Sequence, residues 1–133
     1  PKAWKIAEIF NADLVSDAWK FKATTQDIMD IDYVEHSYTT ERLDGTTAPL
    51  TEMPHTIINT SCEHIDNFSK WYDLLPEGRL IILQSNNYFS IEEHVNCSSS
   101  LQEFSASAPM QTVLYEGELD LGQYTRYMKI GRK

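Results

Sequence analysis

Glycine is scarce in this chain of 133 residues, and its absence from one kind of pattern excludes one kind of site. There are five glycines, and no two of them form a Gly-x-Gly pair. Such pairs let the backbone approach the charged end of a bound cofactor, because any side chain would block the contact. The sequence therefore contains no glycine-rich loop that could hold that end of a cofactor.

Basic residues are also few. Lys and Arg together number 11, against 20 Asp and Glu, and the formal net charge is −9 at pH 7. A field of that sign repels phosphate backbones, which argues against broad nucleic-acid binding. One basic cluster stands near the C-terminus, and we interpret it as a solvated end, with a local basic patch as the alternative: Arg126, Lys129, Arg132 and Lys133.

Cysteines and long apolar runs are scarce as well. The two cysteines are Cys62 and Cys97, and no apolar run approaches the length of a membrane span. No signal-peptide pattern precedes them, so two thiols favour a reducing compartment, and we expect a cytoplasmic protein without membrane association. The chain starts at Pro1 rather than Met, which favours a fragment, a processed chain or an incomplete reading frame.

What is present indicates one globular α/β domain with a sizeable core. Hydrophobic residues make up 41% and charged residues 23% of the chain, both ordinary values for such a domain. Apolar spacing predicts an amphipathic helix over about 2–10, and alternation of apolar residues with lysines predicts a strand over 19–25. A short helical segment is expected over 28–33.

Residues 35–55 show no hydrophobic period and contain Gly45, Pro49 and Pro54. We predict a long loop excursion over this segment. Loops of that length inside a compact domain are uncommon and often functional, and a flexible surface insertion is the alternative.

The segment from Thr56 to Phe89 carries the strongest local pattern. A short buried strand over 56–60 leads into a helix whose first residues, Thr60 to Glu63, fit a capping box. The helix ends near Leu75, and Leu75-Pro-Glu-Gly78 suits a type I turn. The continuous apolar run over 80–83 then predicts a central strand covered on both faces.

The remainder predicts short helices and a hairpin. Ser90 to Glu93 could cap a helical turn, and Ser100 to Glu103 caps a short helix. Strand-like runs over 110–119 and 124–130 predict an antiparallel hairpin at the sheet edge. Alternation of helices and strands through the chain predicts a mainly parallel sheet with right-handed crossovers.

Three segments in this order resemble the class I S-adenosylmethionine-dependent methyltransferases: Phe21 to Ile28, Ile57 to Ile65, and Leu75 to Leu83. That family has a seven-stranded doubly wound sheet whose last strand is antiparallel. A His some ten residues beyond the fifth strand also recurs in the family, and His94 fits it. The resemblance implies a Rossmann-like, mainly parallel sheet with a C-terminal antiparallel hairpin that lacks the first two strands. Residues 1–133 would then form a single partial methyltransferase-like domain.

The sequence departs from the family's pattern at the turn before the fifth strand and in the part that binds the cofactor. Glu77 replaces one usual turn residue, and Arg79 stands where the family often has a second glycine. The glycine-rich loop and the ribose-binding acid have no counterpart. The resemblance covers the family's later half to two-thirds, so we expect the chain on its own to be inactive and to bind the cofactor weakly or not at all unless another chain completes the sheet.

The resemblance assigns binding residues. Asp27 and Ile28 would contact the adenine of S-adenosylmethionine, and Asn59 and Thr60 would lie beside its methionine end. Asn86, Asn87 and Tyr88 would line the substrate side and suit a small polar acceptor. Each assignment has a structural alternative: a surface acid or cap for Asp27, a cap for Thr60, and a turn rich in Asn for the last group.

Glu63, His64 and His94 are the candidate catalytic residues. Glu63 has a structural alternative in the capping box, and His94 suits a general base because imidazole titrates near neutral pH. In some relatives, including RNA 3′-end methyltransferases, a Glu-x-x-Glu-His run and a later His hold a divalent cation. Thr60 replaces the first Glu here, so we assign no metal ligands and keep a cation at these three residues as an alternative. The cysteine and histidine spacings do not match structural zinc sites.

The sequence thus favours a methyltransferase domain that transfers a methyl group to a small polar acceptor. One alternative is a non-catalytic Rossmann-like interaction module, and another is a metal-assisted enzyme. Missing strands would leave a bare sheet edge, and bare edges tend to pair with another chain. We therefore expect a homodimer or a partner that completes the sheet.

Overall fold

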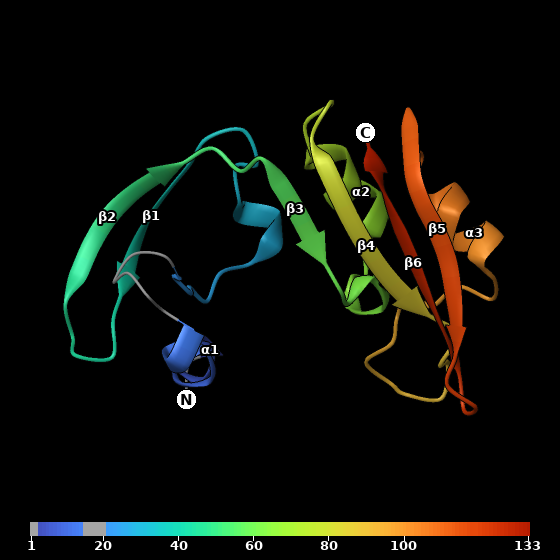
Figure 1. The fold of residues 1–133 in the computed structure, drawn as a ribbon, viewed down its shortest axis with the longest axis horizontal. Coiled ribbons are helices and arrows are strands. Elements are labelled where there is room, and N and C mark those ends of the chain that lie inside the picture. The colour runs from blue at the N-terminus through green and yellow to red at the C-terminus, as the bar shows by residue number, and fades with distance from the viewer. Residues whose placement is uncertain (1–2, 15–20) are drawn as a thin grey trace. The chain divides into compact units, whose positions relative to one another are not determined.

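The computed structural model describes residues 3–14 and 21–133 of the chain. Residue contacts divide it into two compact units, Pro1–Met53 and Pro54–Lys133 (Figure 1). None of the helices in these described ranges has the length and apolar character needed to cross a membrane. The candidate site lies in the second unit.

The first unit contains the predicted N-terminal helix. Helix α1 spans Ala3–Asn11 and buries Trp4 and Glu8, and the 3-10 turn η1 (Ala12–Leu14) follows it. The helix is confirmed from Ala3 onward, while Lys2 lies outside the described residues. The carboxylate of Glu8 is 3.1 Å from the guanidinium of Arg42, which balances a charge buried in this small unit.

The predicted strand over 19–25 is wrong for its described part, since residues 21–25 form no ladder; residues 19 and 20 lie outside the description. Side chains hold this segment instead. Thr25 Oγ1 accepts a hydrogen bond from the Trp4 amide, and Arg42 donates to the carbonyl of Phe21. The helical segment expected over 28–33 is a single 3-10 turn, η2 (Ile28–Asp30).

The long loop predicted over 35–55 is also wrong, because strands β1 (His36–Glu41) and β2 (Thr47–Glu52) form an antiparallel hairpin there. Threonine is common in this segment and favours extended structure. Pro49 is tolerated because a two-stranded hairpin leaves one side of each strand without ladder partners. Gly45 has φ of 84° in the connecting turn, a conformation that glycine adopts at low cost.

The second unit is built on a four-stranded mixed sheet with the order β3-β4-β6-β5. Its strands are β3 (Thr56–Asn59), β4 (Leu80–Asn86), β5 (Thr112–Asp120) and β6 (Thr125–Arg132). β3 and β4 are parallel, and β6 is antiparallel to both β4 and β5. β3, β4 and β5 therefore run in one direction and β6 in the other. The predicted hairpin is confirmed, but β6 lies inside the sheet rather than at its edge.

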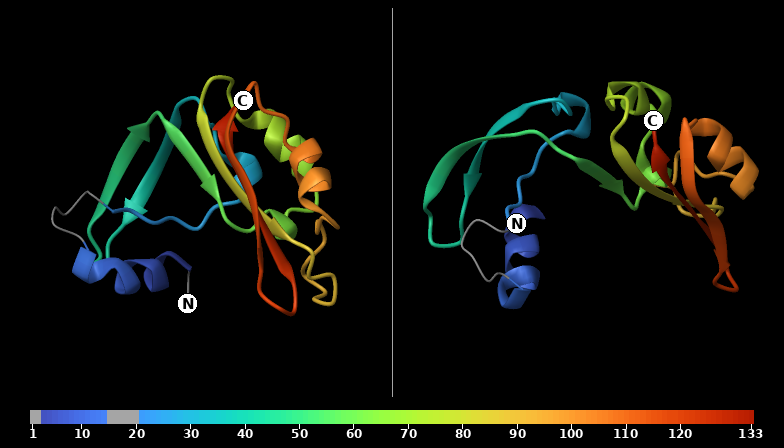
Figure 2. Two further views of the ribbon diagram at one scale, coloured as in Figure 1. Left: turned by 45° about the vertical axis from the view of Figure 1, so that its right-hand side comes forward. Right: turned by 45° about the horizontal axis from the view of Figure 1, so that its top comes forward.

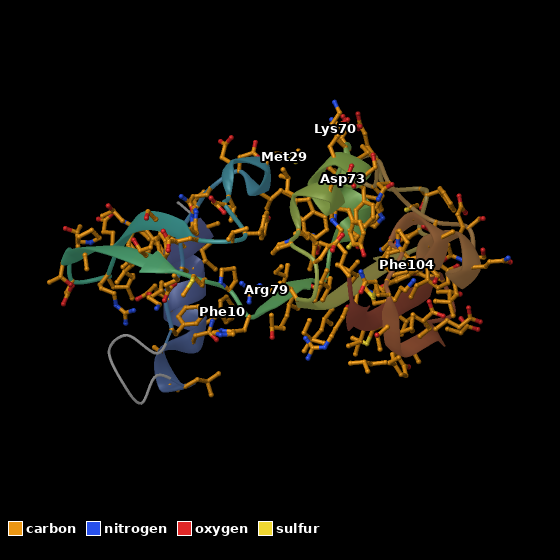
Figure 3. The ribbon with its side chains drawn as sticks, turned by 90° about the horizontal axis from the view of Figure 1, so that it is seen from above. Phe10, Met29, Lys70, Asp73, Arg79 and Phe104 are labelled. Atoms are coloured by element: carbon orange, nitrogen blue, oxygen red, sulfur yellow. The ribbon has the colours of Figure 1, made fainter. Side chains whose placement is uncertain are left out.

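Two helices of this unit, α2 (Phe68–Leu74) and α3 (Leu101–Ser107), lie on the same face of the sheet (Figures 2 and 3). Ile81 and Leu83 of β4, alternate residues that share one face of the sheet, are fully buried. Phe104 of α3 stacks on Tyr127 of β6, with ring centroids 6.4 Å apart. This layer forms the core, and it fixes the ends of β3 and β4 from which the candidate site is built.

Local signals around the strands were partly right. A turn does precede β4, with Gly78 at φ of 76°, but the Gly78 amide donates to the carbonyl of Lys133, so the type I turn predicted over Leu75–Gly78 does not form in that way. Ser100 caps α3 by accepting a hydrogen bond from the Glu103 amide, as predicted. The capping box at Thr60 is wrong: residues after β3 form one 3-10 turn, η3 (Cys62–His64), whose first flanking residue is Ser61 without a side-chain cap. β4 continues through Asn86, and Ser90 to Glu93 form turns rather than a helix.

Candidate functional site

Three polar side chains meet beyond the carboxyl ends of β3 and β4. Glu63 and His64 belong to η3, which follows β3, and His94 belongs to the loop that follows β4. Each of the three offers a ligand atom, and these atoms lie within 4.8 Å of one another. The structure thus brings together the three residues that the sequence indicated as catalytic, and we call them the Glu-His-His cluster.

Glu63 is a buried carboxylate with one oxygen engaged. Its side chain accepts a hydrogen bond through Oε1 from Nδ2 of Asn86 at 2.7 Å, and Nη2 of Arg126 lies 3.5 Å from the same oxygen. Oε2 is buried and has no hydrogen-bond partner among the residues that the structure describes. Because buried polar atoms are normally paired, this oxygen is a point at which a ligand would be stabilised. Glu63 is therefore part of a polar network and does not cap a helix.

Both histidines are held by their Nδ1 atoms. Nδ1 of His64 is 3.0 Å from the carbonyl of Glu93, and Nδ1 of His94 is 2.9 Å from the carbonyl of Tyr88. A carbonyl can only accept, so each Nδ1 carries the proton, and each Nε2 of the neutral ring keeps a lone pair. The two rings meet edge-on, with centroids 4.7 Å apart. The pair therefore offers two nitrogen bases beside the buried carboxylate.

Arg126 belongs to this site and was missed by the sequence analysis. Its Nη1 donates to the carbonyl of Thr60 at 3.2 Å and to Oε1 of Gln84 at 3.1 Å, while Nη2 faces Glu63. One guanidinium thus joins the ends of β3 and β4 to the carboxylate. Only the register of β6, which places Arg126 opposite Asn86, could have revealed it.

The basic C-terminal cluster is not a solvated end. Lys129 is 3% exposed, and its ammonium group donates to Ser105 and lies 3.2 Å from Glu116. Lys133 donates to the carbonyls of Tyr72 and Leu75, beyond the last turn of α2. The interpretation of a solvated end is therefore corrected for Lys129 and Lys133, whose ammonium groups are bound within the fold.

The two cysteines are free thiols with raised pKa values. Burial raises the pKa of Cys62 to about 12, and burial together with the nearby Glu63 charge raises the pKa of Cys97. A thiol with such a pKa stays protonated near pH 7 and is a poor nucleophile or metal ligand. Neither cysteine is therefore a catalytic candidate.

Thiol chemistry gives a pH-dependent prediction. At pH 8 in native protein, Cys62 should resist an aromatic disulfide reagent, whereas both thiols should react in urea. Above pH 9 the free energy of unfolding should fall, because Cys62 ionises in the unfolded chain before it does in the native one. The first expectation is checked by measuring how fast the reagent releases its coloured thiolate at pH 8, and the second by comparing the urea midpoints of unfolding at pH 8 and pH 10. Rapid reaction of both thiols in the native protein would contradict the burial of Cys62.

The residues assigned to the cofactor make local contacts. Asp27 accepts a hydrogen bond from the Met29 amide at 2.9 Å and caps η2, and the carbonyl of Ile28 accepts one from the Tyr33 hydroxyl. The Asn59 side chain accepts from the Ser61 amide at 2.9 Å. Asp27 and Ile28 belong to the first unit, whereas Asn59 and Thr60 belong to the second.

The glycines give no sign of a cofactor-anchoring loop. Gly45, Gly78 and Gly122, the three with positive φ, lie in turns between strands or after a helix. None of the glycines in the described ranges pairs with another at a strand end. The residues present therefore do not fit the charged end of S-adenosylmethionine, and the cofactor contacts remain predictions.

Of the three residues assigned to the substrate, two are occupied internally. Asn86 is the last residue of β4 and is 1% exposed. Its side-chain Nδ2 donates a hydrogen bond to Glu63, and its side-chain Oδ1 accepts one from the backbone N–H of Tyr88. Asn87 accepts from the Thr125 amide at 2.6 Å. Tyr88 is partly exposed, and its ring stacks on that of Tyr124, a residue that the sequence analysis did not assign.

The arrangement can accept a proton or coordinate a cation, because it combines a buried carboxylate oxygen with two unprotonated imidazole nitrogens. These groups converge where open α/β sheets place their ligands, at the carboxyl ends of neighbouring parallel strands. No family model, curated protein or solved structure matches this chain.

Proposed function

We propose that this chain carries the methyl-acceptor side of a class I S-adenosylmethionine-dependent methyltransferase with a Rossmann-like sheet. The observation that carries the proposal is the position of the Glu-His-His cluster beyond β3 and β4, the strands that resemble the family's fourth and fifth. The strand directions support it, since the last strand runs antiparallel to the other three. The acceptor is a small polar molecule.

The chain's own residues would prepare the acceptor. Nε2 of His94 or His64 takes the proton from an O–H or N–H group, while Nδ1 stays fixed on its carbonyl. The Glu63 carboxylate stabilises the imidazolium that forms. When bound, the cofactor supplies an electrophilic methyl group on its sulfonium, which is chemistry that belongs to the cofactor.

The residues that anchor the charged end of the cofactor would have to come from another chain or segment. β3 is at one edge of the sheet, so its outer backbone groups have no ladder partner within the second unit. Such an edge pairs readily with another strand. We propose that a homodimer or another chain completes the sheet there; a Rossmann-like interaction module without catalysis is the alternative that this edge favours.

Calorimetry with S-adenosylhomocysteine tests the methyltransferase proposal. We expect weak binding, with a Kd of about 1 mM, or about −4 kcal/mol, because the anchoring half is absent. ATP is the control, since it carries an adenine but no amino-acid end. No heat with S-adenosylhomocysteine at millimolar concentration would favour the interaction module, and equal heat with ATP would contradict specific recognition.

A metal-assisted enzyme is the second candidate, because the cluster fits a divalent cation. Three ligand atoms lie within 4.8 Å of one another, and Oε2 of Glu63 is unpaired. Metal-ligating histidines usually donate their other N–H to a carbonyl, as His64 and His94 both do. One Glu and two His would leave a coordination position open, as in catalytic zinc sites.

Zinc titration with matched variants tests this candidate. We expect the wild-type chain to bind one Zn²⁺. His64→Ala should lower the affinity for Zn²⁺ by more than roughly 10–100-fold, which is the loss that follows removal of a residue that only hydrogen-bonds to a metal ligand. His55→Ala is the control, because His55 is exposed and makes no hydrogen bond in the described structure. Absence of stoichiometric zinc, or equal losses in both variants, would rule the metal site out.

A further inference from the structure

We propose that Tyr88 and Tyr124 form the stacking surface for the acceptor, and that the acceptor is a planar aromatic molecule without negative charge. This inference rests on the proposed function, because it names the substrate class of the same site. It starts from the finding that the amides expected to contact the substrate, Asn86 and Asn87, are engaged within the fold.

The rings form a continuous row that leads to the Glu-His-His cluster. Tyr124 and Tyr88 are stacked at an angle of 2°, with centroids 5.1 Å apart. Tyr88 meets His94 edge-on at 6.1 Å, and His94 meets His64 edge-on at 4.7 Å. A planar molecule that packs against this row is therefore placed beside the nitrogen bases, and aromatic pairs favour such stacked or edge-on arrangements.

The two tyrosines also offer unused polar groups. Both residues are partly exposed, and neither hydroxyl has a hydrogen-bond partner among residues 3–14 and 21–133. Tyrosines with an apolar ring and a free hydroxyl suit a ligand that has one aromatic face and one polar substituent. An aliphatic polyol would leave the ring faces without a partner.

The surrounding charge selects against anions. Glu92 and Glu93 are exposed in the loop between Tyr88 and His94, and Arg126 of the candidate site already faces Glu63. The chain as a whole carries a formal charge of −9. An aromatic amine is therefore favoured over an aromatic acid, because aromatic faces and carboxylates both attract cations.

Saturation-transfer NMR with three small probes tests the proposal without any cofactor. The probes are tyramine, 2-cyclohexylethylamine of equal charge, and 4-hydroxyphenylacetate with an equal ring and a negative charge. We expect tyramine to bind about two- to tenfold more tightly than 2-cyclohexylethylamine, which is the range of an aromatic pair. We also expect it to bind more tightly than 4-hydroxyphenylacetate, because the surrounding charge is negative. Tyr88→Leu and Tyr124→Leu should lose the preference over 2-cyclohexylethylamine, and Tyr88→Phe should keep it.

The outcomes separate this inference from the methyltransferase proposal. Tyramine binding that depends on Tyr88 supports the aromatic surface even where S-adenosylhomocysteine gives no heat. Equal affinity for tyramine and 2-cyclohexylethylamine overturns it, even where S-adenosylhomocysteine binds. A tyramine preference unchanged in both leucine variants overturns it as well. The dispersion of amide spectra shows that each variant is folded, and Tyr88→Phe provides the conservative comparison.

Discussion

Arg126→Gln should lower the free energy of unfolding by about 3 kcal/mol. Removing one partner of a buried ion pair typically costs about 3–5 kcal/mol, because the other charge stays buried without compensation. The Glu63 side chain is 3% exposed, while that of Arg126 is 30% exposed, which places this pair near the lower limit. Arg126 also joins Thr60 and Gln84, so the ends of β3 and β4 should loosen together. Urea unfolding followed by circular dichroism measures the loss.

Two further variants separate charge pairing from general packing. Arg79→Gln is the matched control, because Arg79 makes no hydrogen bond or ion pair in the described structure, and it should change stability by less than about 0.5 kcal/mol. The double variant Arg126→Gln/Glu63→Gln removes both charges. Its free energy of unfolding should fall by less than the sum of the losses in the two single variants. A double variant as unstable as the sum of the single ones would contradict pairing between the two residues.

Phe104→Ala should cost about 3–5 kcal/mol, the usual range for emptying a buried phenylalanine site. Phe104 is 1% exposed and connects α3 to Tyr127 of β6 (Figure 3). The remaining cavity would lie under the central strands, where β6 supports Arg126. The same urea experiment measures this effect.

Phe89→Ala is the control for that substitution. Phe89 lies in the loop after β4 and is 61% exposed, so its removal should have little effect on stability. Similar losses in the two variants would contradict the packing of α3 described above. A large loss in Phe89→Ala alone would instead indicate that Phe89 is covered in solution.

Elements with local physical causes were predicted from the sequence. Ser100 caps α3 because its hydroxyl reaches the Glu103 amide three residues later, a distance set by the helix itself. A turn before β4 follows from the proline and glycine of Leu75 to Gly78, although it is not the type I turn that was predicted. β4 was found because a central strand, buried by its neighbours, reads as a continuous apolar run.

Two features that the local sequence pattern does not reveal were missed or misassigned. The hairpin of β1 and β2 has polar residues on both faces, so its sequence lacks the apolar alternation that predicts a strand. The capping box at Thr60 matched a local pattern, but Glu63 forms its contacts with β4 and β6 instead. A short pattern cannot show that a tertiary contact competes for the same carboxylate.

Only part of the candidate site could be predicted from the sequence. Glu63 and His64 directly follow a strand, and His94 follows the next one, so sheet topology alone indicates that they meet. Arg126 and Tyr124 come from the last hairpin, and their place depends on the register of β6 against β4. Nothing in their local sequence distinguishes them from surface residues.

An NMR titration tests the central claim most directly, namely that the Glu-His-His cluster marks the ligand side of this sheet. Assigned amide spectra would be recorded with S-adenosylhomocysteine at millimolar concentration. We predict shifts at Asn59 to His64 and at Asn86 to His94, and little change at α3. Shifts confined to residues outside these two segments, or no shifts at all, would contradict the account.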